Sequence, residues 1–221
     1  MKEQRDVAAS PKYRVLCLHG IGTNSEVFEA QTAALRYRLG ANFEYEFLDG
    51  SFPWPALPGI SEVFGNDQMY FSYHDGSGES AYQAVRDLAA YATENGPFDA
   101  VLAFSLGAAL AATLLIEDAS RALFRCAIFI CATLPYDVEE LQAGRLQLLS
   151  GEISRNSIRI PTVHAWGTND TEYMHESAQL VQMSVEGKRV EVKHDAAHGV
   201  PTQGESLDHL AEAIISTVCG T

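Results

Sequence analysis

The chain has 221 residues, 47% of them hydrophobic, and its 29 acidic against 15 basic residues give a formal charge of −14. This size predicts one domain over residues 11–221, after a flexible segment at residues 1–10. The negative charge argues against nucleic acid and anionic membranes as partners. No apolar run approaches the roughly 18–20 residues of a membrane span and no apolar leader is present, so a cytoplasmic protein is expected.

Short apolar runs alternate with longer segments of helical period, which is typical of a mainly parallel sheet with helices on both faces. Six strands are predicted, at Tyr13–Leu18, Phe43–Leu48, Ala100–Phe104, Cys126–Cys131, Pro161–Trp166 and Arg189–Lys193. Helices are predicted at Glu26–Leu39, Glu79–Glu94, Leu106–Glu117, Thr171–Val185 and Ser206–Val218, with a further helical segment within Asp137–Leu149. The predicted fold class is therefore α/β.

The first predicted strand ends in a glycine-rich turn, His19-Gly20-Ile21-Gly22, that opens the first helix. A turn of this kind exposes backbone N–H groups that can stabilise an anionic oxygen, and Ile21 is the expected donor. A dinucleotide loop is the alternative, but Ser25 stands where the third glycine of its G-x-G-x-x-G pattern belongs.

The segment from Gly50 to Gly78 is long for a connection and rich in proline, glycine and aromatic residues. Long loops are often functional, so this segment is predicted to form a wall of the binding site. The side chains predicted to line an apolar pocket are Phe52, Trp54 and Tyr73, together with Leu134 and Tyr136 after the fourth strand. Anchoring of these aromatic residues to the core stays open as the alternative.

Ser105 stands in Ala103-Phe104-Ser105-Leu106-Gly107, between an apolar strand and an alanine-rich helix. Strand, sharp turn and helix in succession lift a hydroxyl out of the sheet, as in the G-x-S-x-G nucleophile elbow, and Ala103 keeps the first glycine position small. The sequence therefore predicts Ser105 as a nucleophile, with the backbone N–H of Leu106 as the second oxyanion donor.

A nucleophilic serine needs a base and an acid, supplied in the chain order Ser, Asp, His from loops after later strands. Asp170 follows the fifth predicted strand and His198 follows the sixth. Asp170 alone could instead cap the following helix. The conjunction of order and placement predicts the catalytic triad Ser105, Asp170 and His198.

A metal site at His194 and His198 is the weaker alternative, because the pair lacks the H-E-x-x-H pattern and has no cysteine nearby in the sequence. The four cysteines, Cys17, Cys126, Cys131 and Cys219, have no C-x-x-C spacing and are predicted to be reduced packing residues. No metal is predicted.

These residues resemble those of a known family, the fungal serine hydrolases of the FSH1 type, which includes LovG-like polyketide thioesterases. The matching pieces are Leu16 to Gly20 with Asn24 and Phe28, Phe47 to Gly50, Phe104 to Ala108, Gly167 to Asp170, and His194 to Pro201. The resemblance spans nearly the whole chain. It implies an α/β-hydrolase fold without a large lid, and its triad maps onto Ser105, Asp170 and His198.

The resemblance also implies hydrolysis of esters and thioesters without a cofactor, in secondary metabolism. The substrate expected first is an acyl or polyketide chain released from a thioester, with the acyl carrier domain of a synthase as a possible partner. Residues offered for a basic docking patch are Arg36, Arg38, Arg121, Arg125, Arg155 and Arg159. A carboxylesterase acting on small oxygen esters and a non-catalytic receptor with a hydrolase fold remain the alternatives.

Overall fold

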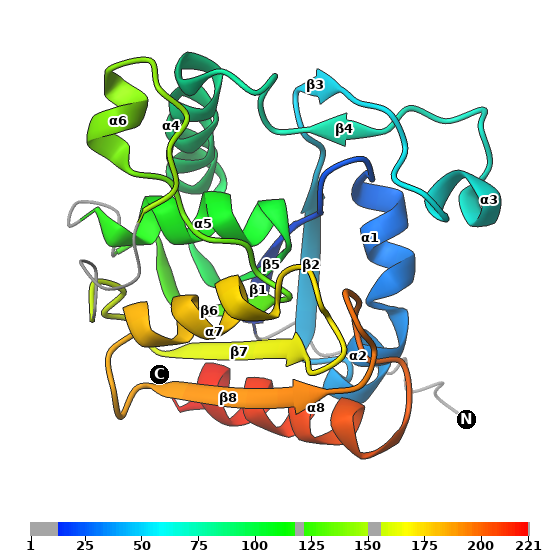
Figure 1. Ribbon diagram of the computed structural model, residues 1–221. Coiled ribbons are helices and arrows are strands. Elements are labelled where there is room, and N and C mark those ends of the chain that lie inside the picture. Colours follow the sequence, from blue (N-terminus) through cyan, green and yellow to red (C-terminus); the bar gives the residue numbers. More distant parts are fainter. Residues whose placement is uncertain (1–12, 118–121, 150–155, 221) are drawn as a thin grey trace, which may run out of the picture.

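The computed structural model describes residues 13–117, 122–149 and 156–220, so the flexible segment predicted at residues 1–10 lies outside it. Its centre is a parallel six-stranded sheet in the order β2-β1-β5-β6-β7-β8 (Figure 1). The strands are β1 Tyr13–Leu18, β2 Phe43–Leu48, β5 Phe98–Phe104, β6 Phe124–Ile130, β7 Thr162–Gly167 and β8 Arg189–His194. All six predicted strands are present, with bounds that differ by two residues at most.

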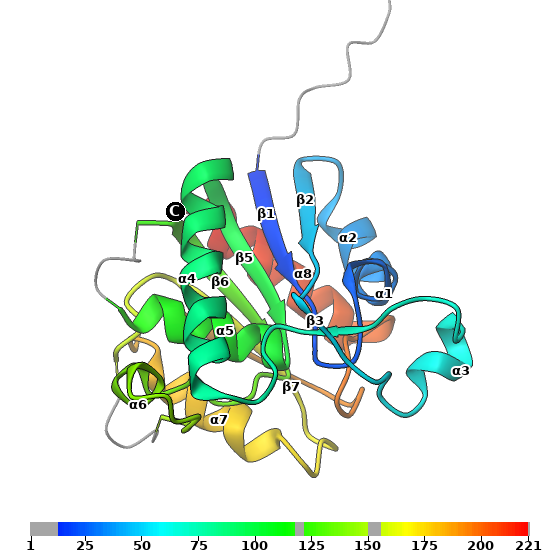
Figure 2. The same cartoon turned by 90° about the horizontal axis from the view of Figure 1, so that it is seen from above.

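Helices cover both faces of this sheet (Figure 2). One face carries α1 Ser25–Gln31, α2 Ala33–Leu39 and α8 Gly204–Cys219. The other face carries α4 Gly78–Asn95, α5 Leu106–Ile116 and α7 Met174–Met183. The short helix α6 Val138–Gln142 packs against α4. Alternate side chains of β5 enter the two cores: Leu102 and Phe104 point to one and Val101 and Ala103 to the other. The sheet is therefore buried on both sides, as the sequence predicts.

The helix that follows Ser105 is apolar on all sides, with Leu106 to Leu115 buried. It packs against both β5 and α4, and its four alanines allow close packing against these neighbours. Among the residues that the structure describes, no helix is long and apolar enough to cross a membrane.

Two helical predictions differ from the structure. The continuous helix predicted at Glu26–Leu39 is wrong, because it is interrupted at Thr32, whose hydroxyl donates to the carbonyl of Phe28 at 2.8 Å while its backbone leaves the helical region (φ −92°, ψ 1°). Within Asp137–Leu149 only α6 is helical, and the chain turns away at Gly144 with φ 77°.

The segment 50–78 contains structure of its own. Strands β3 Phe52–Pro53 and β4 Phe71–Ser72 pair antiparallel, and α3 Ile60–Phe64 lies between them. The backbone of Phe71 pairs with the turn after β1, accepting from Gly22 N at 2.9 Å and donating to Thr23 O at 2.7 Å. The segment is thereby anchored to the carboxyl edge of the sheet, beside the predicted site.

Candidate active site

Ser105 occupies the turn between β5 and α5 with φ 52° and ψ −117°, a strained conformation for a residue other than glycine. Its backbone N–H donates to Ile130 O at 3.0 Å, which fixes the turn to the neighbouring strand. Close packing requires Gly107, where an added Cβ would lie 2.6 Å from the carbonyl oxygen of His19. Ala103 is fully buried, so the small side chain fits the position of the first elbow glycine.

Asp170 follows β7 and is 3% exposed. One carboxylate oxygen, Oδ1, accepts from Tyr173 N at 3.0 Å just before α7. The other, Oδ2, lies 2.6 Å from His198 Nδ1. Asp170 therefore does not cap α7, whose N-cap residue is Tyr173; its Oδ1 fixes the turn before that helix and its Oδ2 faces the imidazole.

His198 follows β8, and its Nε2 lies 3.0 Å from Ser105 Oγ. Since a carboxylate only accepts hydrogen bonds, Nδ1 carries the hydrogen that faces Asp170, and Nε2 accepts from the serine hydroxyl. The ring contacts those of Phe104 and Tyr173, with centroid distances of 5.2 and 4.7 Å. The structure thus brings Ser105, His198 and Asp170 into one hydrogen-bonded relay.

Cys131, the residue after β6, contacts the loop that carries His198. The thiol lies 3.6 Å from the carbonyl oxygen of Ala197 and 3.5 Å from that of Gly199, which flank His198. Burial raises the pKa of Cys131 to about 12, so the thiol stays protonated and can donate. The sequence predicts Cys131 only as a packing residue, because nothing in it signals contact with a loop more than 60 positions later.

Ligand atoms of Cys131, Asp170 and His198 all lie within 4.8 Å of one another, a grouping that could hold a metal ion. The sequence has no cysteine near His194 and His198, but the fold supplies Cys131, the residue after β6. The carboxylate and imidazole nevertheless face each other at hydrogen-bonding distance and the thiol is protonated. This chemistry favours the relay, and the lack of a resident metal stays a prediction.

The two predicted oxyanion donors belong to the turn after β1 and to the residue that follows Ser105. Gly20, which precedes Ile21, is so close to Ser105 that an added Cβ would be 3.3 Å from the serine Cβ. Leu106 is the first residue of α5, where backbone N–H groups lack helical partners and the helix dipole is positive. Within the part of the chain that the structure describes, neither the Ile21 nor the Leu106 N–H makes a hydrogen bond.

The turn that carries Ile21 is fixed by His19, whose side chain is fully buried. Its Nε2 accepts from Gly50 N at 2.9 Å, which leaves Nδ1–H to donate to Gly20 O at 2.6 Å. Burial lowers the pKa of His19, so the ring stays neutral as this pattern requires. The Thr23 hydroxyl donates to the same carbonyl at 2.7 Å. His19 therefore positions the turn, a role that its place in a motif does not reveal.

Comparison with known proteins identifies the family of this chain. The family model described as "Serine hydrolase (FSH1)" matches residues 9–210. The chain belongs to this serine hydrolase family. Esterase FPY3 of Fusarium mangiferae is 39% identical over 211 residues, which cover 93% of this chain and 96% of that protein. Hydrolase phiM of Fungal sp. (strain ATCC 74256) is 33% identical and covers 79% of both chains. The resemblance stated from the sequence is confirmed, and the protein is a hydrolase.

Solved structures agree with the fold of this serine hydrolase. A carboxylesterase from Mesorhizobium loti superposes with a TM-score of 0.63 over 95% of this chain and 90% of its own, at 15% identity. The Bacillus cereus carboxylesterase gives 0.57 over 93% and 88%, at 16% identity. At these identities the likeness concerns the fold alone. The predicted α/β-hydrolase fold is confirmed.

The predicted substrate-binding residues of the serine hydrolase do not line one cavity. Tyr73 lines a cavity of about 270 Å³ against α4, whereas Trp54 lines a more open hollow of about 320 Å³ beside β3 and β4. Phe52 is half-buried within β3. The structure therefore separates the aromatic residues of segment 50–78 into at least two environments.

The remaining two predicted pocket residues make local contacts after β6. The Tyr136 hydroxyl lies 2.8 Å from His74 Nε2, and its ring is buried in the core under α4 and α5. Leu134 is half-buried, and its N–H donates to Glu176 Oε2 at 2.9 Å. Tyr136 therefore matches the anchoring interpretation, whereas Tyr73 lines a cavity.

The arginines offered for a docking patch are dispersed in the serine hydrolase. Ion pairs join Arg36 to Glu29 at 3.4 Å, Arg38 to Asp208 at 3.2 Å and Arg125 to Asp99 at 2.8 Å, while Arg159 is exposed. Arg125 and Arg159 lie at the amino ends of β6 and β7, opposite the edge that carries Ser105. Arg121 and Arg155 lie outside the described residues.

Proposed function

We propose that this protein hydrolyses acyl thioesters and esters through a covalent acyl-Ser105 intermediate, and that a thioester-bound acyl or polyketide chain is its preferred substrate. The observation that carries the proposal is the relay at the carboxyl edge of the sheet, with 3.0 Å from Ser105 Oγ to His198 Nε2 and 2.6 Å from His198 Nδ1 to Asp170 Oδ2. Both distances are within the reach that proton transfer needs.

In the acylation step, His198 takes the hydroxyl proton at Nε2 while Ser105 Oγ bonds to the carbonyl carbon. Asp170 stabilises the imidazolium that results. When the tetrahedral intermediate collapses, the bond from carbon to sulfur breaks, and the thiolate takes the proton from Nε2. For an oxygen ester the alkoxide leaves in the same way.

In the deacylation step, a water molecule attacks the acyl carbon and gives its proton to His198 Nε2. The bond to Ser105 Oγ then breaks, the serine recovers the proton, and the free acid leaves. In both steps the carbonyl oxygen becomes negative, and the N–H groups of Ile21 and Leu106 are the proposed donors to it. The loss of one such donor typically lowers turnover about 10²- to 10³-fold.

Thioesters are proposed first because of the leaving group. A thiol has a pKa of about 8.5, so a thiolate leaves with little help, whereas an alkoxide depends on the proton from His198. The 39% identical relative that is named an esterase favours oxygen esters as the second substrate class. The same machinery serves both, and the difference between them lies in rate.

The test of the nucleophile is intact-protein mass after treatment with a fluorophosphonate. We expect one adduct on the natural protein and none on Ser105→Ala, with both proteins showing the same thermal unfolding. The absence of an adduct from the folded natural protein would contradict the proposal and favour a non-catalytic receptor with this fold.

The test of the substrate class compares octanoyl-pantetheine with ethyl octanoate, which share one acyl chain. We expect kcat/KM to be at least about tenfold higher for the thioester; the reverse ratio would assign the protein as a carboxylesterase. Acyl carriers are usually acidic, and the described arginines do not gather beside Ser105. The free pantetheine thioester is therefore the substrate to test before a carrier-bound chain.

A further inference from the structure

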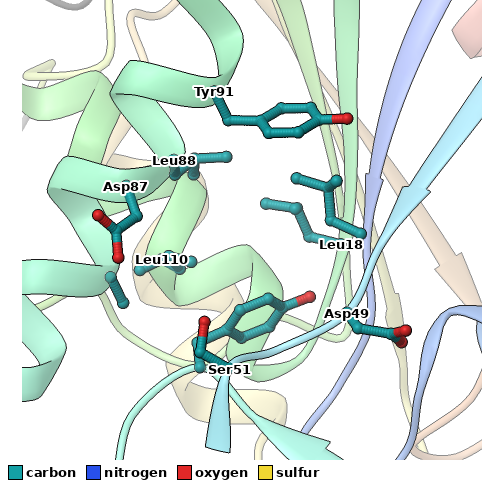
Figure 3. A pocket seen from close by; sticks show the side chains of 10 residues that line it. Leu18, Asp49, Ser51, Asp87, Leu88, Tyr91 and Leu110 are labelled. Carbon is teal, nitrogen blue, oxygen red and sulfur yellow. The ribbon is translucent and has the colours of Figure 1, made fainter.

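The cavity of about 270 Å³ lies between α4 and the carboxyl ends of β1 and β2, and we call it the α4 chamber. Figure 3 shows Leu88 and Tyr91 of α4 on one side, with Leu18 of β1 opposite and Leu110 of α5 below. At about 30 Å³ for each small group, the chamber has room for roughly nine non-hydrogen atoms. Its walls suit an apolar chain of that length.

One wall of the α4 chamber carries a hydroxyl whose hydrogen has no acceptor among the described residues. Tyr73 is 6% exposed, and its hydroxyl makes no hydrogen bond of acceptable geometry with the described protein. Buried hydroxyls are normally hydrogen-bonded, so this unmet donor is available to an acceptor atom of a ligand. Burial raises the pKa of Tyr73 well above its ordinary value, and the backbone N–H of His19 opposes this shift to a smaller degree. The hydroxyl therefore stays protonated and can donate to an oxygen acceptor.

The α4 chamber is close to the proposed oxyanion site. The Tyr73 ring stacks on His19 with a centroid distance of 4.9 Å, and His19 holds the turn that carries Ile21. On α5, Leu110 stands one turn from Leu106, on the same face and about 6 Å further along the helix. The wall of the chamber thus comes within about one helical turn of the residue that follows Ser105.

The edge of the α4 chamber is acidic. Asp49 after β2 and Asp87 on α4 are both exposed and both line it. Two carboxylates disfavour an anionic ligand at this position, since like charges repel. The occupant that fits is a neutral chain, apolar along most of its length and carrying an oxygen substituent.

We propose that the α4 chamber binds the acyl chain of the substrate, and that Tyr73 donates a hydrogen bond to a hydroxyl or keto oxygen on that chain. This inference rests on the proposed function, because it places the acyl part of the molecule that Ser105 attacks. It makes Tyr73 a specificity residue for oxygenated acyl chains.

The first experiment fills the α4 chamber. Ala84 of α4 lines it and is half-buried, so Ala84→Phe places a ring inside, while Ala90→Phe makes the same change on an exposed part of the same helix. With p-nitrophenyl esters from acetyl to decanoyl, we expect Ala84→Phe to lower the decanoyl-to-acetyl ratio of kcat/KM at least about tenfold. Ala90→Phe should keep the natural ratio. Equal ratios in all three proteins would overturn the inference.

The second experiment removes only the hydroxyl. Tyr73→Phe is tested on octanoyl thioesters that carry one hydroxyl at carbon 3, 5 or 7, each against plain octanoyl thioester. We expect the preference for one of the hydroxylated chains to fall about five- to tenfold, the range that one net hydrogen bond supplies. An unchanged preference for all three would overturn the role of Tyr73.

These experiments distinguish a failure of the α4 chamber proposal from a failure of the proposed function. Fluorophosphonate labelling of Ser105 and hydrolysis of the acetyl ester report the proposed function without the α4 chamber. Labelling with an unchanged chain-length profile in Ala84→Phe would overturn the chamber alone. Absence of both labelling and acetyl ester hydrolysis in the natural protein would overturn both proposals.

Discussion

Cys131 and Ala197 have positive φ angles of 45° and 49°, and the thiol of Cys131 lies 3.6 Å from the carbonyl oxygen of Ala197. Neither residue is glycine, so each backbone is strained by roughly 1–3 kcal/mol. Gly167 packs against the same carbonyl, where an added Cβ would be 2.1 Å away. The strained loop is thus clamped beside His198, which makes Cys131 a positioning residue that acts through the loop and not on the substrate.

Replacement of Cys131 tests this positioning. Cys131→Ala removes the contacts with both carbonyls, and we expect kcat to fall about tenfold with little change in KM, because misplaced catalytic groups lose rate steeply. Cys131→Ser can donate to the same carbonyls and should recover part of kcat. Steady-state kinetics and the rate of fluorophosphonate labelling measure both variants. If Cys131→Ala were less stable yet labelled Ser105 at the natural rate, the residue would have only a packing role.

Asp170→Asn tests the relay with little change in shape. The amide oxygen can still accept from Tyr173 N, but the NH₂ group then faces His198 Nδ1 and favours the wrong tautomer. We expect kcat to fall about 10³- to 10⁴-fold at neutral pH, with a small change in melting temperature. A loss below about tenfold would show that Asp170 serves the turn before α7 more than the imidazole.

Gly20→Ala tests the oxyanion turn. The new Cβ would lie 2.9 Å from the Phe104 ring and 3.3 Å from Ser105 Cβ, so the turn has to move and take the Ile21 N–H with it. We expect kcat/KM to fall about 10²-fold, close to the loss of one oxyanion donor. Gly40→Ala is the control, since no atom lies within 4 Å of its added Cβ. Gly40→Ala should lower the free energy of unfolding, because the backbone at this position has a positive φ, and should leave turnover unchanged.

The positions of the strands follow from the sequence because buried parallel strands are continuous apolar runs. The interruption at Thr32 does not, since the residues around it favour helix. The antiparallel pairing of β3 and β4 also depends on tertiary contacts, as the backbone of Phe71 pairs with Gly22 and Thr23 after β1. Such tertiary contacts produce no hydrophobic periodicity in the sequence that would predict them.

The candidate site, too, could be predicted from the sequence only in part. Parallel strands place the residues after them on one edge, so the sequence indicates that Ser105, Asp170 and His198 lie near one another. Their hydrogen bonds depend on loop conformations that the sequence does not reveal, including the positive φ of Cys131. Tyr73 illustrates the limit, because its aromatic character suggests a pocket, but only the structure shows that its hydroxyl hydrogen has no acceptor among the described residues.

His164 predicts how stability depends on pH. It lies inside β7 at 2% exposure, with Nε2 3.0 Å from the hydroxyls of Thr162 and Ser184. Burial, and secondly the charge of Arg189, lowers its pKa to about 3. The unfolded chain takes up this proton near pH 6.5, whereas the folded protein does so only near pH 3. Between these values the unfolded state holds more protons, so the free energy of unfolding falls as the pH falls.

Urea unfolding at pH 7, 6, 5 and 4 measures this dependence in the natural protein and in His164→Gln, whose amide can bond to the same hydroxyls without titrating. We expect the variant to be less stable at pH 7 but to lose stability more slowly on acidification, by up to roughly 1 kcal/mol per pH unit. A residual slope is expected, because burial also lowers the pKa of His19, His74 and His194. Identical slopes in the two proteins would mean that His164 takes up its proton equally in the folded and unfolded states.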